Sequence, residues 1–375
     1  MAYTQDLSRF GFGLIIFWLV VFLLGKIFPL KRYGVEVEPG YITFKSSKFK
    51  AFLYKISERR RVFWRTLSNL SVVFGVGLTI YATFFLLDNL LKLVQPGVQG
   101  TSLLPVLPGL TIRLYWLPYM LLAVSLGIIT HEAAHGIIAR VEKISLESAG
   151  LAFMITFFAG FVEPNEKEFE DSSIVSKLRV ISVGSFVNLA MFLLVMLITT
   201  ALFLNIPSGI VITEVLEGSP IERAGLQQWD VVYDINGTLQ NVANVLAKVT
   251  PGDNLMLNTS KGVLRIVIEN SADGESLGML PPYLIYYRSR LSFGPFFDVQ
   301  LYLTLFWGEV VYSSLALLSM LPLFPFDGDK FLFYVAKRFA TTRSREIRIV
   351  LNVVFFGIIV GNMILSFIKH GPFLI

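Results

Sequence analysis

The sequence is organised around one stretch, Ile128-Ile129-Thr130-His131-Glu132-Ala133-Ala134-His135-Gly136, which ends an apolar run that starts at Leu114. On a helix, residues four apart lie on the same face. His131 and His135 can therefore hold one metal ion between them, with Glu132 beside it as a general base. The pattern H-E-x-x-H on a helix is typical of zinc-dependent hydrolysis.

The composition indicates that this helix lies in a membrane. Hydrophobic residues make up 54% of the 375 residues and charged residues 16%, whereas soluble domains have about 25% charged residues. The mean hydropathy is +0.65. Ionisable side chains inside a membrane helix cost roughly 2.5–3.5 kcal/mol each, so they are functional by default. The alternative interpretation is a helix end whose histidines only meet lipid headgroups.

Membrane-spanning helices need about 20 mostly apolar residues. The first such stretch is too long, and too poor in small residues at its end, for a cleaved signal peptide, so it is interpreted as a retained span. The sequence thus predicts a polytopic α-helical membrane protein of about six transmembrane helices. The six stretches are Phe10–Leu30, Leu67–Val94, Leu114–Ala139, Leu178–Leu204, Leu301–Phe324 and Ile347–Ile368.

The distribution of basic residues predicts the orientation. Lys31–Arg65 carries ten Lys or Arg and Lys337–Arg348 is also basic, whereas Gln95–Arg113 has one basic residue. Basic loops stay in the cytoplasm, which places both termini outside. His131 then lies 17 residues into the third stretch, about 26 Å deep at 1.5 Å per residue. The active site is therefore expected near the cytoplasmic side of the cell membrane.

Three segments between the spans have structure of their own. Val35–Phe44 alternates around Pro39-Gly40 and predicts a β-hairpin. Lys45–Arg65 is interpreted either as a basic stretch on the membrane surface or as a solvated loop. Ile144–Val162 is apolar but too short for a span, and it predicts a re-entrant β-hairpin beside the metal. An interfacial helix is the alternative for that segment.

Pro207–Pro282 has the short β-rich runs and Asn-Gly or Asp-Gly turns of a small soluble domain. The order G-S-P-x-x-x-A-G-L from Gly218, followed by D-V-V-x-x-I-N-G from Asp230, resembles a PDZ domain. Leu277-Gly278-Met279 is similar to the carboxylate-loop strand of the circularly permuted bacterial type. Trp229 stands where PDZ domains commonly have Gly. Such domains bind an extended segment as an added strand, and the predicted topology places this one outside the cell.

A catalytic zinc site needs a third protein ligand, because it usually has three such ligands and one water. The chain has no cysteine and only one further histidine, His370, which the topology places on the opposite face of the membrane. Asp327 directly follows two prolines that break the fifth stretch, at the same predicted depth as His131. It is the preferred ligand in a His₂-carboxylate Zn²⁺ site. The rival carboxylates are Glu142, Glu163 and Asp329.

These motifs together resemble the site-2 protease family of intramembrane zinc metalloproteases over residues 114–330. H-E-x-x-H matches its first motif and Gly184-x-x-x-Asn188 its second. Leu321–Gly328 resembles its L-P-x-P-x-L-D-G segment. Gly184 allows close helix packing, and buried Asn188 needs a partner, which the metal cleft offers.

The resemblance also implies how substrate is bound. The family usually has Asn where this chain has Ser319, and that Asn is thought to hold the substrate backbone. Gly184, Asn188 and Ser319 are the expected substrate-binding residues, with Asn188 taking part of the role that Ser319 leaves open.

The expected activity is regulated intramembrane proteolysis, with transmembrane proteins and the lipid bilayer as partners and no nucleic acid. The PDZ domain would filter substrates or bind a new C-terminus. The alternatives are a non-catalytic membrane adaptor with a structural metal, and a membrane metalloprotease for soluble or lipidated peptides. The sequence carries no signal for oligomeric state. The expected domains are residues 1–66, 67–206, 207–283 and 284–375.

Overall fold

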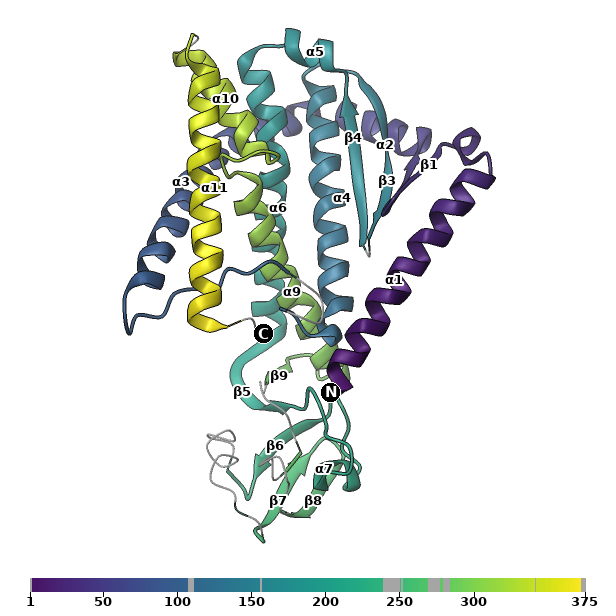
Figure 1. The fold of residues 1–375 in the computed structure, drawn as a ribbon, viewed down its shortest axis with the longest axis vertical. Coiled ribbons are helices and arrows are strands. Elements are labelled where there is room, and N and C mark those ends of the chain that lie inside the picture. Colours follow the sequence, from purple (N-terminus) through teal and green to yellow (C-terminus); the bar gives the residue numbers. More distant parts are fainter. Residues whose placement is uncertain are drawn as a thin grey trace. The chain divides into compact units, whose positions relative to one another are not determined.

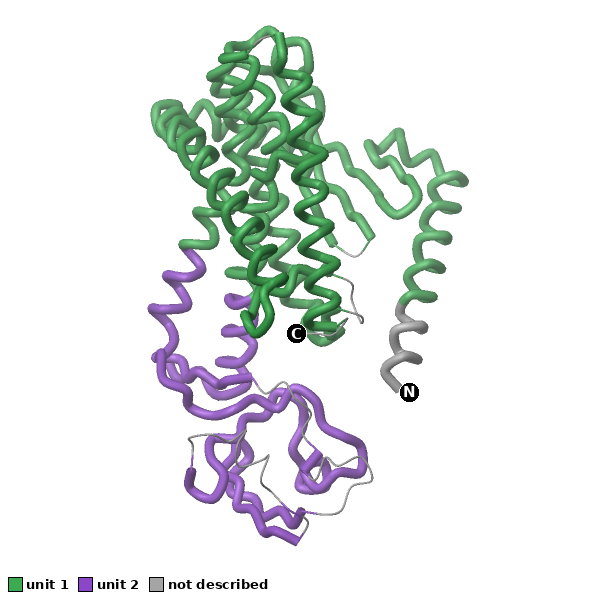
Figure 2. The backbone as a smooth tube through the Cα atoms, turned by 60° about the vertical axis from the view of Figure 1, so that its left-hand side comes forward, with its two compact units in different colours: residues 1–193, 307–375 green, residues 194–306 purple. Residues whose placement is uncertain are grey.

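The computed structural model describes residues 2–106, 111–155, 157–238, 250, 252–268, 277–278, 284–340 and 342–371, with side chains from residue 11 onward. The chain forms two compact units (Figure 2). The first contains residues 1–193 and 307–375, and the second contains residues 194–306. The predicted metal ligands all belong to the first unit.

Five helices among the described residues are long and apolar enough to cross a membrane (Figure 1). Helix α1 (Ala2–Ile27) covers the first predicted stretch, and its described apolar part, Gly11–Ile27, is shorter than the other five. The prediction of a polytopic helical membrane protein is therefore confirmed. The five spanning helices are α3 (Arg61–Val94), α4 (Leu117–Val141, preceded by the 3₁₀ turn Leu114–Trp116), α6 (Ile174–Leu202), α9 (Pro295–Ser319) and α11 (Ser344–His370).

Small residues bring these helices into close contact, as expected where lipid removes most of the hydrophobic drive for packing. A Cβ atom on Gly127 of α4 would lie 2.7 Å from Leu315 Cδ1 of α9. Ser71 of α3 and Ser182 of α6 share a buried hydrogen bond of 2.9 Å. The helices that carry the site are thus held side by side.

A four-stranded antiparallel sheet lies beside α4. Its strands β1 (Val35–Glu38), β2 (Tyr41–Lys45), β3 (Leu146–Met154) and β4 (Phe157–Pro164) lie in that order. The predicted hairpin at 35–44 is confirmed. The segment 144–162 also forms a hairpin, so the alternative of an interfacial helix is wrong, whereas its re-entrance into the membrane stays a prediction. Pairing of β2 with β3, such as Thr43 with Ala152, was not predicted.

Strand β4 is an edge strand of this sheet and lies along the H-E-x-x-H part of α4 (Figure 1). The Phe158 N–H donates a 3.1 Å hydrogen bond to Ser125 Oγ. A Cβ atom on Gly160 would lie 3.1 Å from Ile129 Cα and 3.5 Å from Glu132 Cβ. Glycine is therefore what allows the strand to approach the helix next to Glu132.

The basic segment after β2 forms helix α2 (Ser47–Glu58), which Ser46 caps by accepting a 3.1 Å hydrogen bond from the Phe49 N–H. Leu53 is completely buried, and its Cδ1 would lie 3.0 Å from a Cβ atom on Gly136 of α4. Neither prediction for Lys45–Arg65 included this packing against α4. One face of α2 belongs to the protein core, while Lys48 and Lys55 are exposed.

The predicted break in the fifth span fixes the start of α10 (Asp327–Phe339). Helix α9 ends at Ser319, five residues before the predicted end, because Pro322 and Pro325 cannot continue it. The turn between the helices folds back so tightly that a Cβ atom on Gly328 would lie 2.3 Å from the carbonyl oxygen of Met320.

Helix α11 anchors this turn through polar contacts. Asn352 Oδ1 accepts a 2.6 Å hydrogen bond from the Phe324 N–H, and its Nδ2 donates to Asp329 Oδ1 at 2.7 Å. Arg348 donates to both oxygens of buried Asp329 at 2.5–3.0 Å. Helix α11 therefore holds the chain both before Asp327, at Phe324, and after it, at Asp329.

The second unit contains a five-stranded antiparallel sheet in the order β8-β7-β6-β5-β9. Trp229 has φ +75°, the left-handed conformation that glycine adopts without strain. Met279 and the segments 239–249 and 269–276 of the predicted domain lie outside the described residues, and the PDZ assignment stays a prediction. The described elements are β5 (Phe203–Val211), α7 (Pro220–Arg223), β6 (Val231–Ile235), β7 (Asn254–Thr259), β8 (Gly262–Val267) and β9 (Leu284–Ser289).

We expect Gly328→Ala to destabilise the protein by about 1–3 kcal/mol, the usual cost of overpacking, because its new methyl group would meet backbone atoms of Met320. The matched control is Gly357→Ala on α11, where a Cβ atom meets nothing within 4 Å. Thermal unfolding in detergent measures both. Equal melting temperatures for the two variants would contradict the tight turn.

Candidate metal centre

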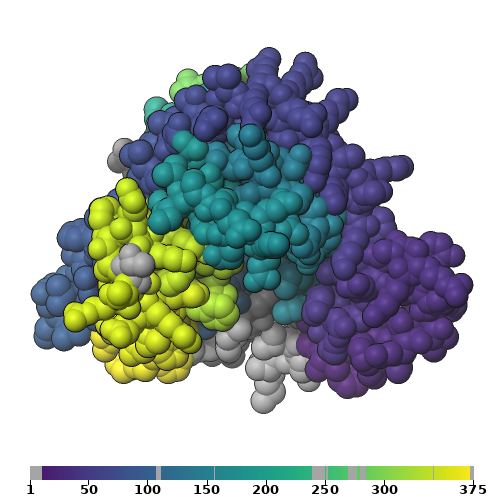
Figure 3. Space-filling view, turned by 90° about the horizontal axis from the view of Figure 1, so that it is seen from above, coloured from purple at the N-terminus to yellow at the C-terminus, as the bar shows by residue number. Residues whose placement is uncertain are grey.

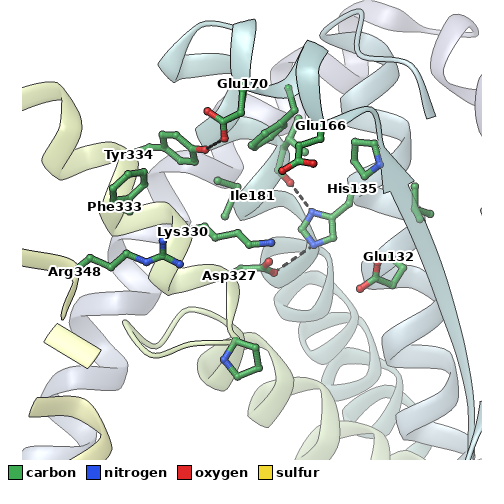
Figure 4. Close-up of a pocket in the computed structure, with 15 residues that line it drawn as sticks. Glu132, His135, Glu166, Glu170, Ile181, Asp327, Lys330, Phe333, Tyr334 and Arg348 are labelled. Atoms are coloured by element: carbon green, nitrogen blue, oxygen red, sulfur yellow. Dashed lines mark hydrogen bonds and ion pairs between the residues drawn. The ribbon is translucent and has the colours of Figure 1, made fainter. Parts of the chain in front are cut away.

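Two histidines of α4 converge on one carboxylate of α10 (Figure 4 labels His135 and Asp327). His131 Nε2 lies 3.0 Å and His135 Nε2 lies 3.3 Å from the same atom, Asp327 Oδ2. Zinc bonds of about 2.0–2.1 Å in a tetrahedron place ligand atoms about 3.3 Å apart. The three side chains therefore fit a zinc ion.

The hydrogen bond of His135 selects the tautomer that a metal needs. Its Nδ1 lies 2.6 Å from the Val180 carbonyl oxygen, which can only accept a hydrogen bond. The proton is thus assigned to Nδ1, and the lone pair of Nε2 faces Asp327. A lone pair and a carboxylate oxygen that face each other favour a cation between them.

Asn188 of α6 gives an independent test at His131. Its Nδ2 lies 3.0 Å from His131 Nδ1, while its Oδ1 is buried without a hydrogen-bond partner among the described residues. The two amide atoms exchange places on a simple flip of the side chain. After that flip Oδ1 accepts a proton from His131 Nδ1, which leaves Nε2 free to bind metal. The orphaned oxygen is satisfied in the metal-binding tautomer.

Gly184 leaves open the space that the ion needs. A Cβ atom there would lie 2.5 Å from His135 Nε2 and 2.6 Å from His131 Nε2. Close packing was expected at Gly184, and the structure shows that the backbone of α6 at Gly184 packs directly against the Nε2 atoms of His131 and His135. Any side chain at this position of α6 would displace the ion or the imidazoles.

The rival carboxylates of the sequence have other partners. Asp329 binds Arg348, as described above. His370 ends α11, 22 residues beyond Arg348, which is about 33 Å along the helix at 1.5 Å per residue. The remaining rivals are Glu142, ion-paired with Arg179 at 3.0 Å, and Glu163, which accepts a hydrogen bond from Ser148.

Glu132 lies next to the two histidines but, unlike Asp327, does not reach their Nε2 atoms at hydrogen-bond distance. The ligand atoms of His131, Glu132 and His135 lie within 4.8 Å of one another, so these three also form a group that could hold an ion. Asp327 reaches both Nε2 atoms at hydrogen-bond distance, and Glu132 adjoins them more loosely. Asp327 thus has the position of the third ligand, and Glu132 that of a neighbouring base.

A cavity of about 590 Å³ opens at this centre (Figure 4). Its lining includes Glu132, His135 and Asp327, together with residues of α5 (Glu166–Asp171) and α10. Figure 3 shows the teal segment that contains α5 next to the yellow-green segment of α10 and α11. The cavity thus reaches His135 and Asp327 of the candidate centre.

An ion-pair network lies on the same wall. The Tyr334 hydroxyl donates a hydrogen bond to Glu170, and this bond lowers the pKa of the Glu170 carboxyl. Lys177 Nζ lies 3.4 Å from the same carboxylate. Sequence reasoning missed Tyr334 and Lys330, although spacings of seven and three residues from Asp327 on a helix could have found them.

The third expected substrate-binding residue, Ser319, ends α9 and is half-buried. It does not belong to the described residues that line the cavity. Of the expected set, the structure brings Gly184 and Asn188 into contact with the histidines and leaves Ser319 outside that group.

We expect Gly184→Ala to remove most bound zinc, because the new methyl group would occupy the space beside both Nε2 atoms. Gly77→Ala on α3 is the control, since a Cβ atom there meets nothing within 4 Å. Metal analysis of the purified, folded variants checks this, with zinc below a tenth of the protein in the first and stoichiometric in the second. A Gly184→Ala variant that keeps a full complement of zinc would contradict the site.

Comparison with known proteins identifies a family and relatives of similar sequence. The model of peptidase family M50 matches residues 119–362, a range that includes α4, α6, α10 and all the side chains that converge at the centre. The chain is also 24% identical over 327 residues to MJ0971, an uncharacterised protein of Methanocaldococcus jannaschii. That alignment covers 84% of this chain and 81% of the relative. The chain belongs to peptidase family M50, the site-2 protease family of membrane metallopeptidases.

Proposed function

We propose that this protein is an intramembrane zinc endopeptidase that hydrolyses peptide bonds within transmembrane segments of membrane-anchored proteins. The observation that carries the proposal is the convergence of His131 and His135 of an apolar helix on Asp327 Oδ2, at 3.0 and 3.3 Å. Family membership supports a metallopeptidase. The cellular role proposed for it is regulated intramembrane proteolysis.

His131, His135 and Asp327 would hold the Zn²⁺ ion, and Glu132 would move the proton. Zinc supplies Lewis-acid chemistry at such a site, polarising a carbonyl and lowering the pKa of water toward about 7. Glu132 lines the cavity beside the ligands. Its carboxylate takes a proton from the attacking water and delivers it to the leaving amine.

The edge strand β4 is the proposed platform for substrate. Peptide bonds in a helix are shielded by their own hydrogen bonds, so the substrate must unwind before it is cut. An edge strand offers unpaired backbone groups to an extended segment, and β4 passes next to Glu132. Substrate would pair there, with Gly184, Asn188 and Ser319 as further proposed contacts. Asn188 would also orient His131.

The sheet of the second unit is proposed to be the PDZ domain. Its support is the predicted motif order, the left-handed backbone at Trp229, and the Leu216 N–H, which donates to the Gly278 carbonyl at 3.0 Å. That bond places the Leu277-Gly278 segment beside the residues that lead into Gly218–Leu226. The domain would bind a new C-terminus or exclude substrates with bulky ectodomains.

The open cavity argues against a structural metal in a non-catalytic adaptor, because structural zinc sites are closed by a fourth protein ligand. At this centre, His135, Asp327 and Glu132 all line a space of about 590 Å³. The arrangement thus keeps room for water and a peptide bond beside the ligands.

We expect Glu132→Gln to keep stoichiometric zinc and to lower kcat on a model transmembrane substrate by about 10²–10⁴-fold, the usual contribution of a general base. The amide keeps the shape of the carboxylate but cannot take the proton. Cleavage assays in liposomes, paired with metal analysis, measure both quantities. Undiminished cleavage by this variant would remove Glu132 from its proposed role.

His135→Ala and Asp327→Ala should both lose zinc and activity, since each removes one of three ligands. Glu58→Gln, which changes an exposed carboxylate at the end of α2, is the control and should keep both. Zinc retained at full stoichiometry in Asp327→Ala would show that another group completes the site. It would also favour a metallopeptidase of soluble or lipidated peptides.

The proposed topology places the second unit outside the cell and α10 in the cytoplasm. Because the chain has no cysteine, single-cysteine variants report topology directly. In intact cells, Gln227→Cys in the second unit should react with a membrane-impermeant maleimide, and Lys337→Cys on α10 should react only after permeabilisation. The reverse pattern would invert the orientation.

A further inference from the structure

The cavity beside the metal centre is lined by two cationic side chains, Arg348 and Lys330. The Arg348 guanidinium is already bound within the protein. It donates hydrogen bonds to both oxygens of Asp329, and it lies over the Phe333 ring at 5.3 Å. Lys330 is exposed to the cavity, and none of the described residues forms an ion pair with it. Lys330 is therefore a positive charge in the cavity lining that has no ion-pair partner in the part of the chain that is described.

Helix geometry directs that charge to the centre. Lys330 lies three residues after Asp327 on α10, so both side chains project from the same face. Figure 4 shows the Lys330 ammonium extending toward the side of the cavity where His135 and Asp327 lie.

Four carboxylates line the cavity, Glu132, Glu166, Glu170 and Asp327, and none of them forms an ion pair with Lys330 among the described residues. Asp327 faces the two histidines, and Glu170 accepts a hydrogen bond from Tyr334 and lies 3.4 Å from Lys177 Nζ. Because Lys330 is not held in an ion pair with any of these carboxylates, its ammonium is available to an anion that arises during the reaction. In amide hydrolysis that anion is the former carbonyl oxygen.

We propose that Lys330 is a further catalytic residue, whose ammonium donates a hydrogen bond to the scissile carbonyl oxygen as that oxygen becomes negative. The proposal rests on the proposed function. A water oxygen forms a bond to the carbonyl carbon, and the π electron pair of the carbonyl moves onto its oxygen. Collapse re-forms the carbonyl and breaks the C–N bond, while the water proton passes through Glu132 to the leaving nitrogen. Lys330 keeps its own proton throughout.

Charge that develops only in the transition state predicts a specific kinetic signature. A donor to that oxygen raises kcat and leaves ground-state binding nearly unchanged, and loss of one such donor costs about 10²–10³ in kcat. A lysine that binds only the product carboxylate would change product inhibition and leave kcat intact. A solvated lysine would change neither.

The first experiment compares Lys330→Met, Lys330→Arg and the control Lys337→Met, which removes an exposed lysine from the same helix. Cleavage of a model transmembrane substrate is followed in liposomes with the full chain, and bound zinc is measured. We expect Lys330→Met to keep zinc, to keep KM within about twofold and to lower kcat by about 10²-fold. Lys330→Arg should retain at least a tenth of kcat, and Lys337→Met should behave as wild type.

The second experiment restores the charge chemically. The chain has no cysteine, so Lys330→Cys carries the only thiol and can be modified selectively. Alkylation with 2-bromoethylamine makes a thioether analogue of lysine and should restore kcat at least tenfold over the unmodified variant. Alkylation with iodoacetamide makes a neutral side chain of similar length and should leave kcat low. Equal rates for the two products would overturn the proposal.

The failures of the two proposals are distinguishable. A wild-type chain whose cleavage does not depend on Glu132 or zinc would overturn the proposed function. Zinc-dependent cleavage that stays at the wild-type kcat in Lys330→Met would overturn only the role of Lys330, as would a change in product inhibition alone.

Discussion

The structure depends on bringing a carboxylate of α10 to two imidazoles of α4, although 196 residues separate Asp327 from His131. Three constraints make this possible. The prolines end α9, Gly328 lets the chain fold back on Met320, and α11 holds the turn through Arg348 and Asn352. Gly184, which has no side chain, leaves space beside the Nε2 atoms of the two histidines. Each constraint acts on backbone position, so the ligand geometry is set before an ion binds.

The two histidines are tolerated inside an apolar helix bundle because each has a specific polar partner. His135 uses the Val180 carbonyl, and His131 uses the side chain of Asn188. Asp329, two residues after Asp327, also has a partner: it is ion-paired with Arg348 and does not compete for the metal. A centre that binds a divalent cation can thus persist where unpaired charge would be costly.

Local patterns in the sequence predicted the helices and both hairpins, because apolar length, proline breaks and helical spacing are local signals. The same patterns singled out Asp327, which the structure brings to the two histidines, and its role as a ligand stays a prediction. Pairing of β2 with β3 and the burial of Leu53 against α4 join segments about 80 to 110 residues apart, and no local signal reports such contacts. Lys330 and Tyr334 lie at helical spacing from Asp327, and the cavity shows that this face of α10 belongs to the site. Ser319 was inferred from a family position, and the structure leaves it outside the cavity.

The two hairpins form one sheet, and this determines how the chain can be divided. Tyr41–Lys45 pairs with Gly150–Met154, while the Trp18 indole N–H donates to the Ile155 carbonyl at the tip of the second hairpin. Both contributors precede residue 119, where the family match begins. A shortened chain that starts at residue 119 would leave five residues of β3, Gly150–Met154, without backbone partners along one edge. Trp18 and Tyr41–Lys45 are therefore structural parts of the unit that contains the candidate metal centre.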